Sequence, residues 1–216
     1  MRKGWAAAAL ACALSCAHAD TATDAAIALY SSKHYTEAQA AFEKIATADP
    51  QNAAACYYLG IIYERRGGDR ALNHAVAWLE KAVNLAPNNA GYLADYAGTC
   101  MLIADIERSF NYATRGRDAM EKAIVMDPNN LDARDGLMKF YAQAPWPLED
   151  SSRALTQAEE IGRRNSARGL RAYLRIAQIF EKNGDRSAAR EACKAALKLE
   201  PTNKTALAVL TRLGNP

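Results

Sequence analysis

The chain has 216 residues, of which 50% are hydrophobic and 24% are charged, and its formal net charge is +3. This length suits one mid-sized domain or a short array of repeats. The sequence contains no nucleophile elbow, zinc-protease helix, P-loop or dinucleotide-binding glycine motif, so it offers no support for the enzyme classes that these motifs mark.

Residues 1–19 are typical of a bacterial secretory signal peptide. Arg2 and Lys3 form the basic start, a short apolar core follows, and Ala17-His18-Ala19 matches an A-x-A cleavage site. We therefore expect cleavage near Ala19 and a mature chain, residues 20–216, that is periplasmic or secreted.

Neither nucleic acid nor a membrane span is expected for the mature chain. Cleavage removes two of the 27 basic residues and none of the 24 acidic ones, which leaves a net charge of about +1 and no basic surface excess for a polyanion. The apolar run of the leader is too short to span a bilayer. A lipoprotein anchor at Cys12 or Cys16 is the weaker alternative, because leucine stands two residues before each cysteine rather than the usual three.

The mature chain is organised as successive helical hairpins. In each hairpin two apolar stripes recur at helical spacing, and a turn separates them. Prolines at four positions end hairpins, because the residue before a proline is pushed out of the helical region. The expected hairpins cover residues 20–52, 53–89, 90–130, 131–168 and 169–203, and a capping helix covers 204–213.

Two of the hairpins that prolines bound on both sides are longer than the usual period of about 34 residues. Pro50 and Pro87 are 37 residues apart, and we expect the extra residues in the turn around Arg65–Asp69. Pro128 follows Pro87 by 41 residues. We place the extra residues of this third hairpin near Ile103–Asn111, where they lengthen one or both helices.

The fourth hairpin has an unusual turn, in which Trp146 lies between two prolines. Two prolines forbid a continuous helix there, and the second helix is expected to begin near Glu149–Ser151. We favour a tryptophan that fills the gap between helices over one that is a hot spot for a partner, since its large apolar area is usually buried.

The fifth hairpin has the clearest pattern. Gly184 can take the positive φ that ends a helix, Asp185 can cap the next helix, and Pro201 closes the unit. This arrangement resembles the tetratricopeptide repeat (TPR). The matching residues are Ile176-Ala177, Phe180, Gly184-Asp185, Ala189, Ala196 and Pro201.

The resemblance extends, more weakly, over the four earlier hairpins. It implies an all-α fold, a right-handed α-solenoid of about five TPR-like hairpins with a C-terminal capping helix. It also implies a non-enzymatic protein-interaction module that needs no cofactor, and the export signal suggests a scaffold of the bacterial cell envelope.

In this family the first helix of each hairpin lines a concave groove. Carried over by position, the resemblance implies that a protein or peptide partner is bound by Tyr57, Ile61, Glu64, Asp95, Met101, Asp135, Lys139, Arg171, Arg175 and Gln178. Such a mixture of aromatic, apolar and charged groups suits a peptide with an apolar anchor and one acidic feature. An ordinary solvated helix face is the alternative.

A basic cluster lies in hairpins four and five: Arg163, Arg164, Arg168, Arg171 and Arg175. These arginines could hold a carboxylate or phosphate of a partner. Alternatively they pair on a solvated face with Glu159, Glu160 and Glu181. The carboxylate clamp of chaperone-binding family members is not expected, since Thr23, Ile27 and Tyr58 stand where that clamp has lysine or asparagine.

Metal and nucleophile chemistry have little support. His34 and His74 lie on different hairpins without ligand-spaced neighbours. The three cysteines of the mature chain fall on apolar stripes and are interpreted as small buried hydrophobes, with a disulfide or an intermolecular thiol as the alternative. They are Cys56, Cys100 and Cys193.

Two other classes of function remain open. One is a fixed structural subunit of an envelope assembly, which predicts apolar residues exposed on the convex face. The other is an enzyme or small-molecule binder with a site formed across repeats, which predicts a polar pocket and perturbed ionisable groups near the cysteines or the arginines.

Overall fold

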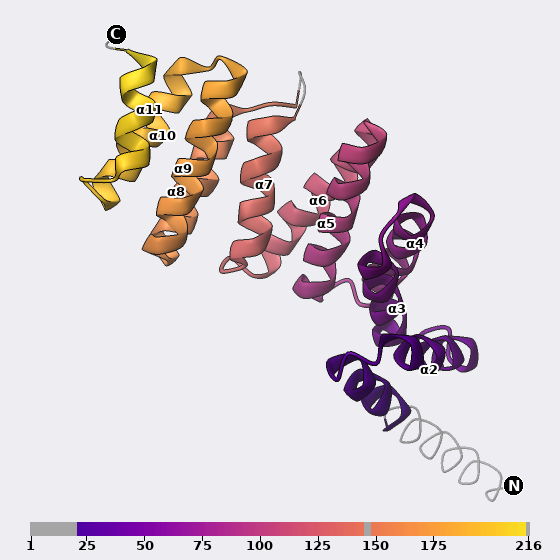
Figure 1. Ribbon diagram of the computed structural model, residues 1–216. Helices are drawn as coiled ribbons and strands as arrows, with labels where there is room; N and C mark the ends of the chain where they lie inside the picture. The colour runs from indigo at the N-terminus through magenta and orange to yellow at the C-terminus, as the bar shows by residue number, and fades with distance from the viewer. Residues whose placement is uncertain (1–20, 145–147, 215–216) are drawn as a thin grey trace, which may run out of the picture. The chain divides into compact units, whose positions relative to one another are not determined.

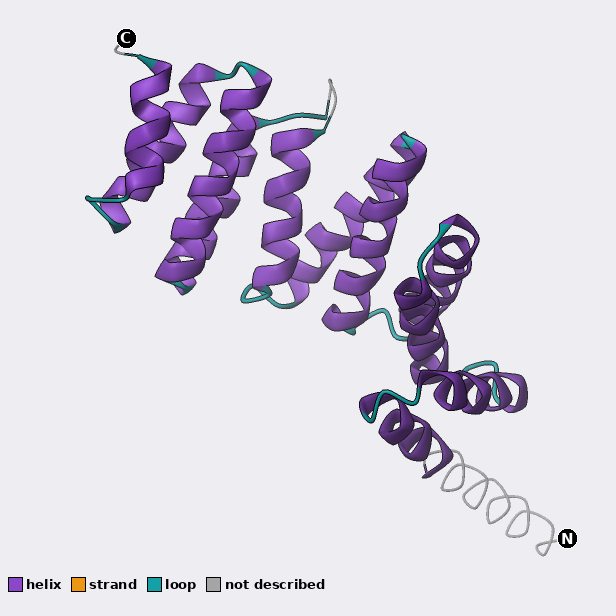
Figure 2. Ribbon diagram, viewed as in Figure 1, coloured by secondary structure: helices purple, strands orange, loops and turns teal. Residues whose placement is uncertain are grey.

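The computed structural model describes residues 21–144 and 148–214, and within these ranges the chain consists of helices and loops with no strand (Figure 2). The expected signal peptide and Trp146 lie outside the described residues. The helical content agrees with the all-α prediction.

Residues 21–31 are helical, and the chain then divides into two compact units, 1–108 and 109–216. The first unit continues with α2 (Tyr35–Ala48), α3 (Ala53–Arg66), α4 (Asp69–Leu85) and α5 (Ala90–Glu107). The second contains α6 (Phe110–Met126), α7 (Leu131–Gln143), α8 (Ser151–Arg164), α9 (Ser166–Asn183), α10 (Arg186–Leu199) and α11 (Lys204–Leu213), as labelled in Figure 1.

A short proline–x–asparagine motif forms the joint between hairpins. The proline follows the end of one helix, and the asparagine two residues later accepts a hydrogen bond from a backbone N–H of the next helix. Asn52 accepts from Ala55 at 2.8 Å, and Asn130 accepts from Ala133 at 2.9 Å. The same bond recurs at Asn89 and Asn203. One three-residue pattern therefore ends one helix and begins the next.

The first unit is held by close packing between consecutive helices. Phe42 and Leu59 are completely buried in its core. A Cβ at Gly60 would lie 2.6 Å from Cγ of Leu79, so only glycine lets α3 and α4 approach this closely. The sequence suggested that the extra residues of the second hairpin lie in its turn, and this prediction was wrong. Gly67 and Gly68 alone join the two helices, and the extra length lies in α4, which has 17 residues.

The second unit contains a closer backbone contact. A Cβ at Gly169 would overlap the backbone of Gly162, so α8 and α9 meet through two glycines. Asn165 joins these helices by itself, ending α8 and capping α9 through Arg168 N–H. Ile161 and Phe180 fill the core nearby.

The predicted ends of the last elements are confirmed. Gly184 has φ 84° at the end of α9, and Asp185 accepts from the N–H of Ala188 at 3.0 Å. The capping helix is α11, and Gly214 ends it with φ 70°. The long third hairpin has two long helices, α5 with 18 residues and α6 with 17. None of the helices in the described ranges is both long enough and apolar enough to cross a bilayer.

Candidate functional site

The predicted site residues lie on the first helices of the hairpins, α3, α5, α7 and α9, which we call the A helices. The second helices, α2, α4, α6, α8 and α10, are the B helices. Residues 21–31 are the A helix of the first hairpin.

In the first unit the structure brings Tyr57 and Asp95 together. The Tyr57 hydroxyl donates to Asp95 Oδ2 at 2.6 Å, which joins α3 to α5. The Tyr57 ring stacks on Tyr92 with 4.2 Å between centroids and 13° between planes. Burial raises the pKa of Tyr57, and the carboxylate of Asp95 raises it further, so this hydroxyl remains a hydrogen-bond donor.

Glu64 lies two helical turns after Tyr57 on the same face of α3. Its carboxyl is half-buried, and the pKa of Glu64 is raised, first by loss of solvent and also by the charge of Asp95. A hydrogen bond from Thr99 and the charge of Arg65 oppose these effects. Glu64 and Asp95 are thus two carboxyl groups in one electrostatic environment, and neither makes an ion pair with any described residue.

Aromatic rings continue from Tyr57 toward the first hairpin. Tyr58 stacks on Phe42 with 4.9 Å between centroids, and Tyr30 lies 5.1 Å from Tyr58. Arg65 lies over the ring of Tyr35 at 4.6 Å and hydrogen-bonds Tyr30. We call Tyr30, Tyr57, Tyr58 and Tyr92 the tyrosine face; all four are half-buried.

The rest of the predicted site in this unit is apolar, and a glycine outside that predicted set leaves open space on α5. Ile61 and Met101 are half-buried on α3 and α5. Gly98 is exposed one turn after Asp95, and a Cβ added to it would meet nothing within 4 Å. The A helices therefore present aromatic rings and two carboxyl groups beside open space.

In the second unit, acidic and basic groups of the predicted site pair with each other. Asp135 of α7 binds Arg175 of α9 at 2.9 Å and Lys139 of its own helix at 2.7 Å. Arg168 binds Asp132 at 2.7 Å. The charges on this α7–α9 surface are therefore largely neutralised within the protein.

The arginine cluster resembles the solvated, paired face that the sequence offered as an alternative. Arg163 binds Glu159 and Glu160, and Arg164 binds Glu160. Glu181 departs from the expected pairing, because it binds Arg212 of α11 at 2.8 Å instead.

Two predicted residues on α9 make no side-chain hydrogen bond or ion pair with another described residue. Arg171 and Gln178 are exposed, and Arg171 makes no ion pair with a described residue. Arg171 is thus the one arginine of the cluster that forms no ion pair within the described residues.

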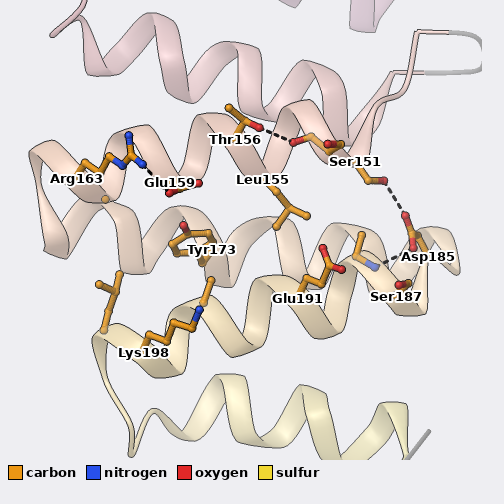
Figure 3. Close-up of a pocket in the computed structure, with 15 residues that line it drawn as sticks. Ser151, Leu155, Thr156, Glu159, Arg163, Tyr173, Asp185, Ser187, Glu191 and Lys198 are labelled. Atoms are coloured by element: carbon orange, nitrogen blue, oxygen red, sulfur yellow. Dashed lines mark hydrogen bonds and ion pairs between the residues drawn. The ribbon is translucent and has the colours of Figure 1, made fainter.

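A pocket in the second unit is lined by none of the predicted partner-binding residues. A cavity of about 780 Å³ lies between the B helices α8 and α10, with Tyr173 of α9 lining it (Figure 3). Ser151 donates to Asp185 at 2.7 Å at one end, and Arg163 and Lys198 lie at the other. Its lining comes from helices that are distant in sequence, which is why no local motif marks it.

The cysteines lie in the core, as interpreted from their apolar stripes. Cys56, Cys100 and Cys193 are all buried thiols. Burial raises the pKa of Cys56 and of Cys193, which makes both poor nucleophiles. Among the described residues no group of His, Cys, Asp and Glu could hold a metal ion.

Comparisons with known proteins agree with this architecture. Residues 170–203 match the family model of the tetratricopeptide repeat, the hairpin with the clearest sequence pattern. No curated protein matches the sequence.

Several solved structures share the fold. YrrB, described as a TPR protein with an unusual peptide-binding site, is 18% identical with a TM-score of 0.67, over 87% of this chain and 89% of that one. MamA is 23% identical with a TM-score of 0.68, over 85% and 92%. PilW, described as a type IV pilus biogenesis factor, is 16% identical with a TM-score of 0.59, over 90% and 84%. The predicted TPR fold class is thereby confirmed.

Proposed function

We propose that this TPR-fold protein, whose residues 170–203 are a tetratricopeptide repeat by sequence, is a non-enzymatic scaffold of the bacterial cell envelope that binds a protein or peptide on its A helices. The observation that carries the proposal is the α3–α5 surface. It combines the tyrosine face with the carboxyl groups of Glu64 and Asp95, which no described cation pairs. Aromatic rings with hydrogen-bonding edges are typical of interaction surfaces.

The similar structures support a binding role. YrrB is described as having a peptide-binding site, and PilW as a pilus biogenesis factor. The envelope location rests on the leader at residues 1–19, which has the three regions of an export signal.

The binding surface is tested by capture from an envelope extract with mature residues 20–216. Gly98→Phe places a large ring in the open space on α5, where a Cβ meets nothing. Lys44→Phe is the matched control, because it places the same ring at an exposed position of α2, a B helix of the same unit. Circular dichroism checks that both variants fold.

We expect a partner that the parent and Lys44→Phe capture and that Gly98→Phe does not. Equal capture by all three proteins would place the binding surface elsewhere. Capture by none would favour a fixed structural subunit or a small-molecule binder instead.

The envelope location has its own test. The full chain, expressed in a bacterium with its leader intact, should be recovered from the periplasm with an intact mass that begins at Asp20. Recovery from the cytoplasm with the leader still attached would contradict an exported scaffold. A mass that begins at a lipid-modified Cys12 or Cys16 would support the lipoprotein alternative.

A further inference from the structure

Acidic groups on the A helices form ion pairs with arginines in the second unit but not, among the described residues, at Glu64 and Asp95 in the first. In the second unit Asp132 and Asp135 each bind an arginine of α9. In the first unit Glu64 and Asp95 influence each other, yet no described residue forms an ion pair with either. Arg65, the basic residue nearest in sequence to Glu64, is held over the Tyr35 ring. Two neighbouring carboxyl groups that form no ion pair with a described residue leave a net negative potential, which the charge of Arg65 only partly offsets.

This negative potential lies beside aromatic rings. Tyr57 contacts both features, because its ring stacks on Tyr92 and its hydroxyl donates to Asp95. Since Asp95 accepts that bond with Oδ2, its second oxygen remains available to a further donor. The π faces of tyrosine rings attract cations, and a planar guanidinium can also stack on such a face.

Open space lies next to both features. Gly98 follows Asp95 by one turn on α5, and nothing lies within 4 Å of a Cβ placed there. Thr99, the next residue, is buried, and its hydroxyl donates to the backbone carbonyl of Asp95 at 3.1 Å. The hydroxyl oxygen of Thr99 is also a hydrogen-bond partner of the Glu64 carboxyl, and the Asp95 carboxyl is held by the Tyr57 hydroxyl. The two carboxyl groups are therefore positioned by the protein before any ligand arrives, and a side chain has room to reach them.

We propose that the α3–α5 surface binds an arginine side chain of an extended, basic partner segment, with the guanidinium against the tyrosine face and between Glu64 and Asp95. The inference rests on the proposed function and names the chemistry of its partner. Arginine fits better than lysine, because its planar fork donates to two carboxylates and stacks on a ring at the same time. The sequence had suggested a partner with an acidic feature; Arg175, one of the residues behind that suggestion, is paired with Asp135.

The probe is a fluorescein-labelled octapeptide of alternating arginine and glycine, and its anisotropy is titrated with the mature chain. A second octapeptide carries citrulline, which has the shape of arginine without its charge, and a third carries lysine. The variants are Glu64→Gln and Asp95→Asn, which keep the size of both side chains and one acceptor oxygen in each. Asp132→Asn is the matched control, since it removes one negative charge from an exposed site in the other unit.

We expect the arginine peptide to bind more tightly than the lysine peptide, and the citrulline peptide to bind least. Loss of either carboxylate should weaken arginine binding by roughly tenfold, as for a hydrogen bond to a charged group. Asp132→Asn should leave the affinity unchanged.

Three results would overturn the inference. One is equal binding of the arginine and citrulline peptides. Another is an equal loss of affinity in Asp132→Asn and in the Glu64 and Asp95 variants, which would mean general attraction to an acidic protein. The third is binding of none of the peptides.

The same variants separate this inference from the proposed function. One possible result is a partner that Gly98→Phe fails to capture but that Glu64→Gln and Asp95→Asn still capture. This result would support the proposed binding surface and contradict recognition of an arginine by the two carboxyl groups. If Gly98→Phe and Lys44→Phe capture the partner equally, the proposed surface fails whatever the peptides do.

Discussion

A single carboxyl group, Glu64, links the stability of the first unit to pH. Its pKa is raised above the ordinary value of 4.5 in the folded protein, mainly by loss of solvent. Between those two pKa values the folded state binds more protons than the unfolded state. The free energy of unfolding therefore falls as pH rises through this interval.

Glu64→Gln should remove this pH-dependent contribution. The free energy of unfolding of the variant, relative to the parent, should be higher at about pH 7 than at about pH 4, because only the parent buries a charge at neutral pH. Urea unfolding of both proteins at each pH measures the difference. The same difference at both pH values would show that Glu64 ionises as freely in the folded protein as in the unfolded chain.

Two glycines should respond in opposite ways to alanine. Gly169→Ala should lower the free energy of unfolding by about 1–3 kcal/mol, because the added methyl group overlaps the backbone of Gly162. Gly98→Ala should raise it by about 0.8–1 kcal/mol, because the methyl group meets nothing and alanine favours helix. Chemical denaturation compares the two, and shifts of the same sign would contradict the packing described for α8 and α9.

At the level of elements, the chain reuses one way of joining helices. Each proline–x–asparagine joint ends a B helix and caps the helix that follows, so the spacing of these joints sets the length of the hairpins between them. The α9–α10 turn uses a different pair, Gly184 and Asp185. Asp185 also accepts the Ser151 hydroxyl at 2.7 Å, which connects the starts of α8 and α10.

Asp185→Ala should lower the free energy of unfolding by about 1 kcal/mol for the cap alone, with the loss of the Ser151 bond in addition. Asp185→Asn keeps an acceptor for the Ala188 N–H and should restore most of the stability. Ser151→Ala measures the second bond separately. Thermal unfolding of the three variants gives these values, and a full loss in Asp185→Asn would mean that the charge, rather than the cap, stabilises the turn.

At the level of the whole molecule, stability is distributed between two units that each have a core. In arrays of helical hairpins each repeat contacts mainly its neighbours, so a local defect is felt locally. Phe42 is completely buried among residues of the first unit.

Phe42→Ala should therefore destabilise the first unit by about 3–5 kcal/mol. Amide hydrogen exchange should accelerate in residues 21–66 and stay unchanged in α9, α10 and α11. Ala41→Gly, at a half-buried neighbouring position, controls for the general effect of a smaller side chain on α2. A uniform loss of protection along the chain would show that the two units unfold as one.

Local signals in the sequence determined much of the fold. Apolar periodicity, prolines and caps such as Asp185 act over a few residues. The hairpin of residues 169–203 and the helix at 204–213 were therefore predictable without any long-range contact. These signals did not show which element contains the extra residues of the second hairpin. The extra residues lie in α4 and not in the turn.

Which charges compensate each other was decided only by the tertiary structure. Arg175 and Asp135 are 40 positions apart, and Tyr57 and Asp95 are 38 apart, so no local pattern reveals that they pair. The sequence by itself placed all four on A helices. Only the packing of one hairpin on the next neutralised the first pair and left Glu64 and Asp95 without an ion pair among the described residues, because electrostatic energy depends on distance in space rather than along the chain.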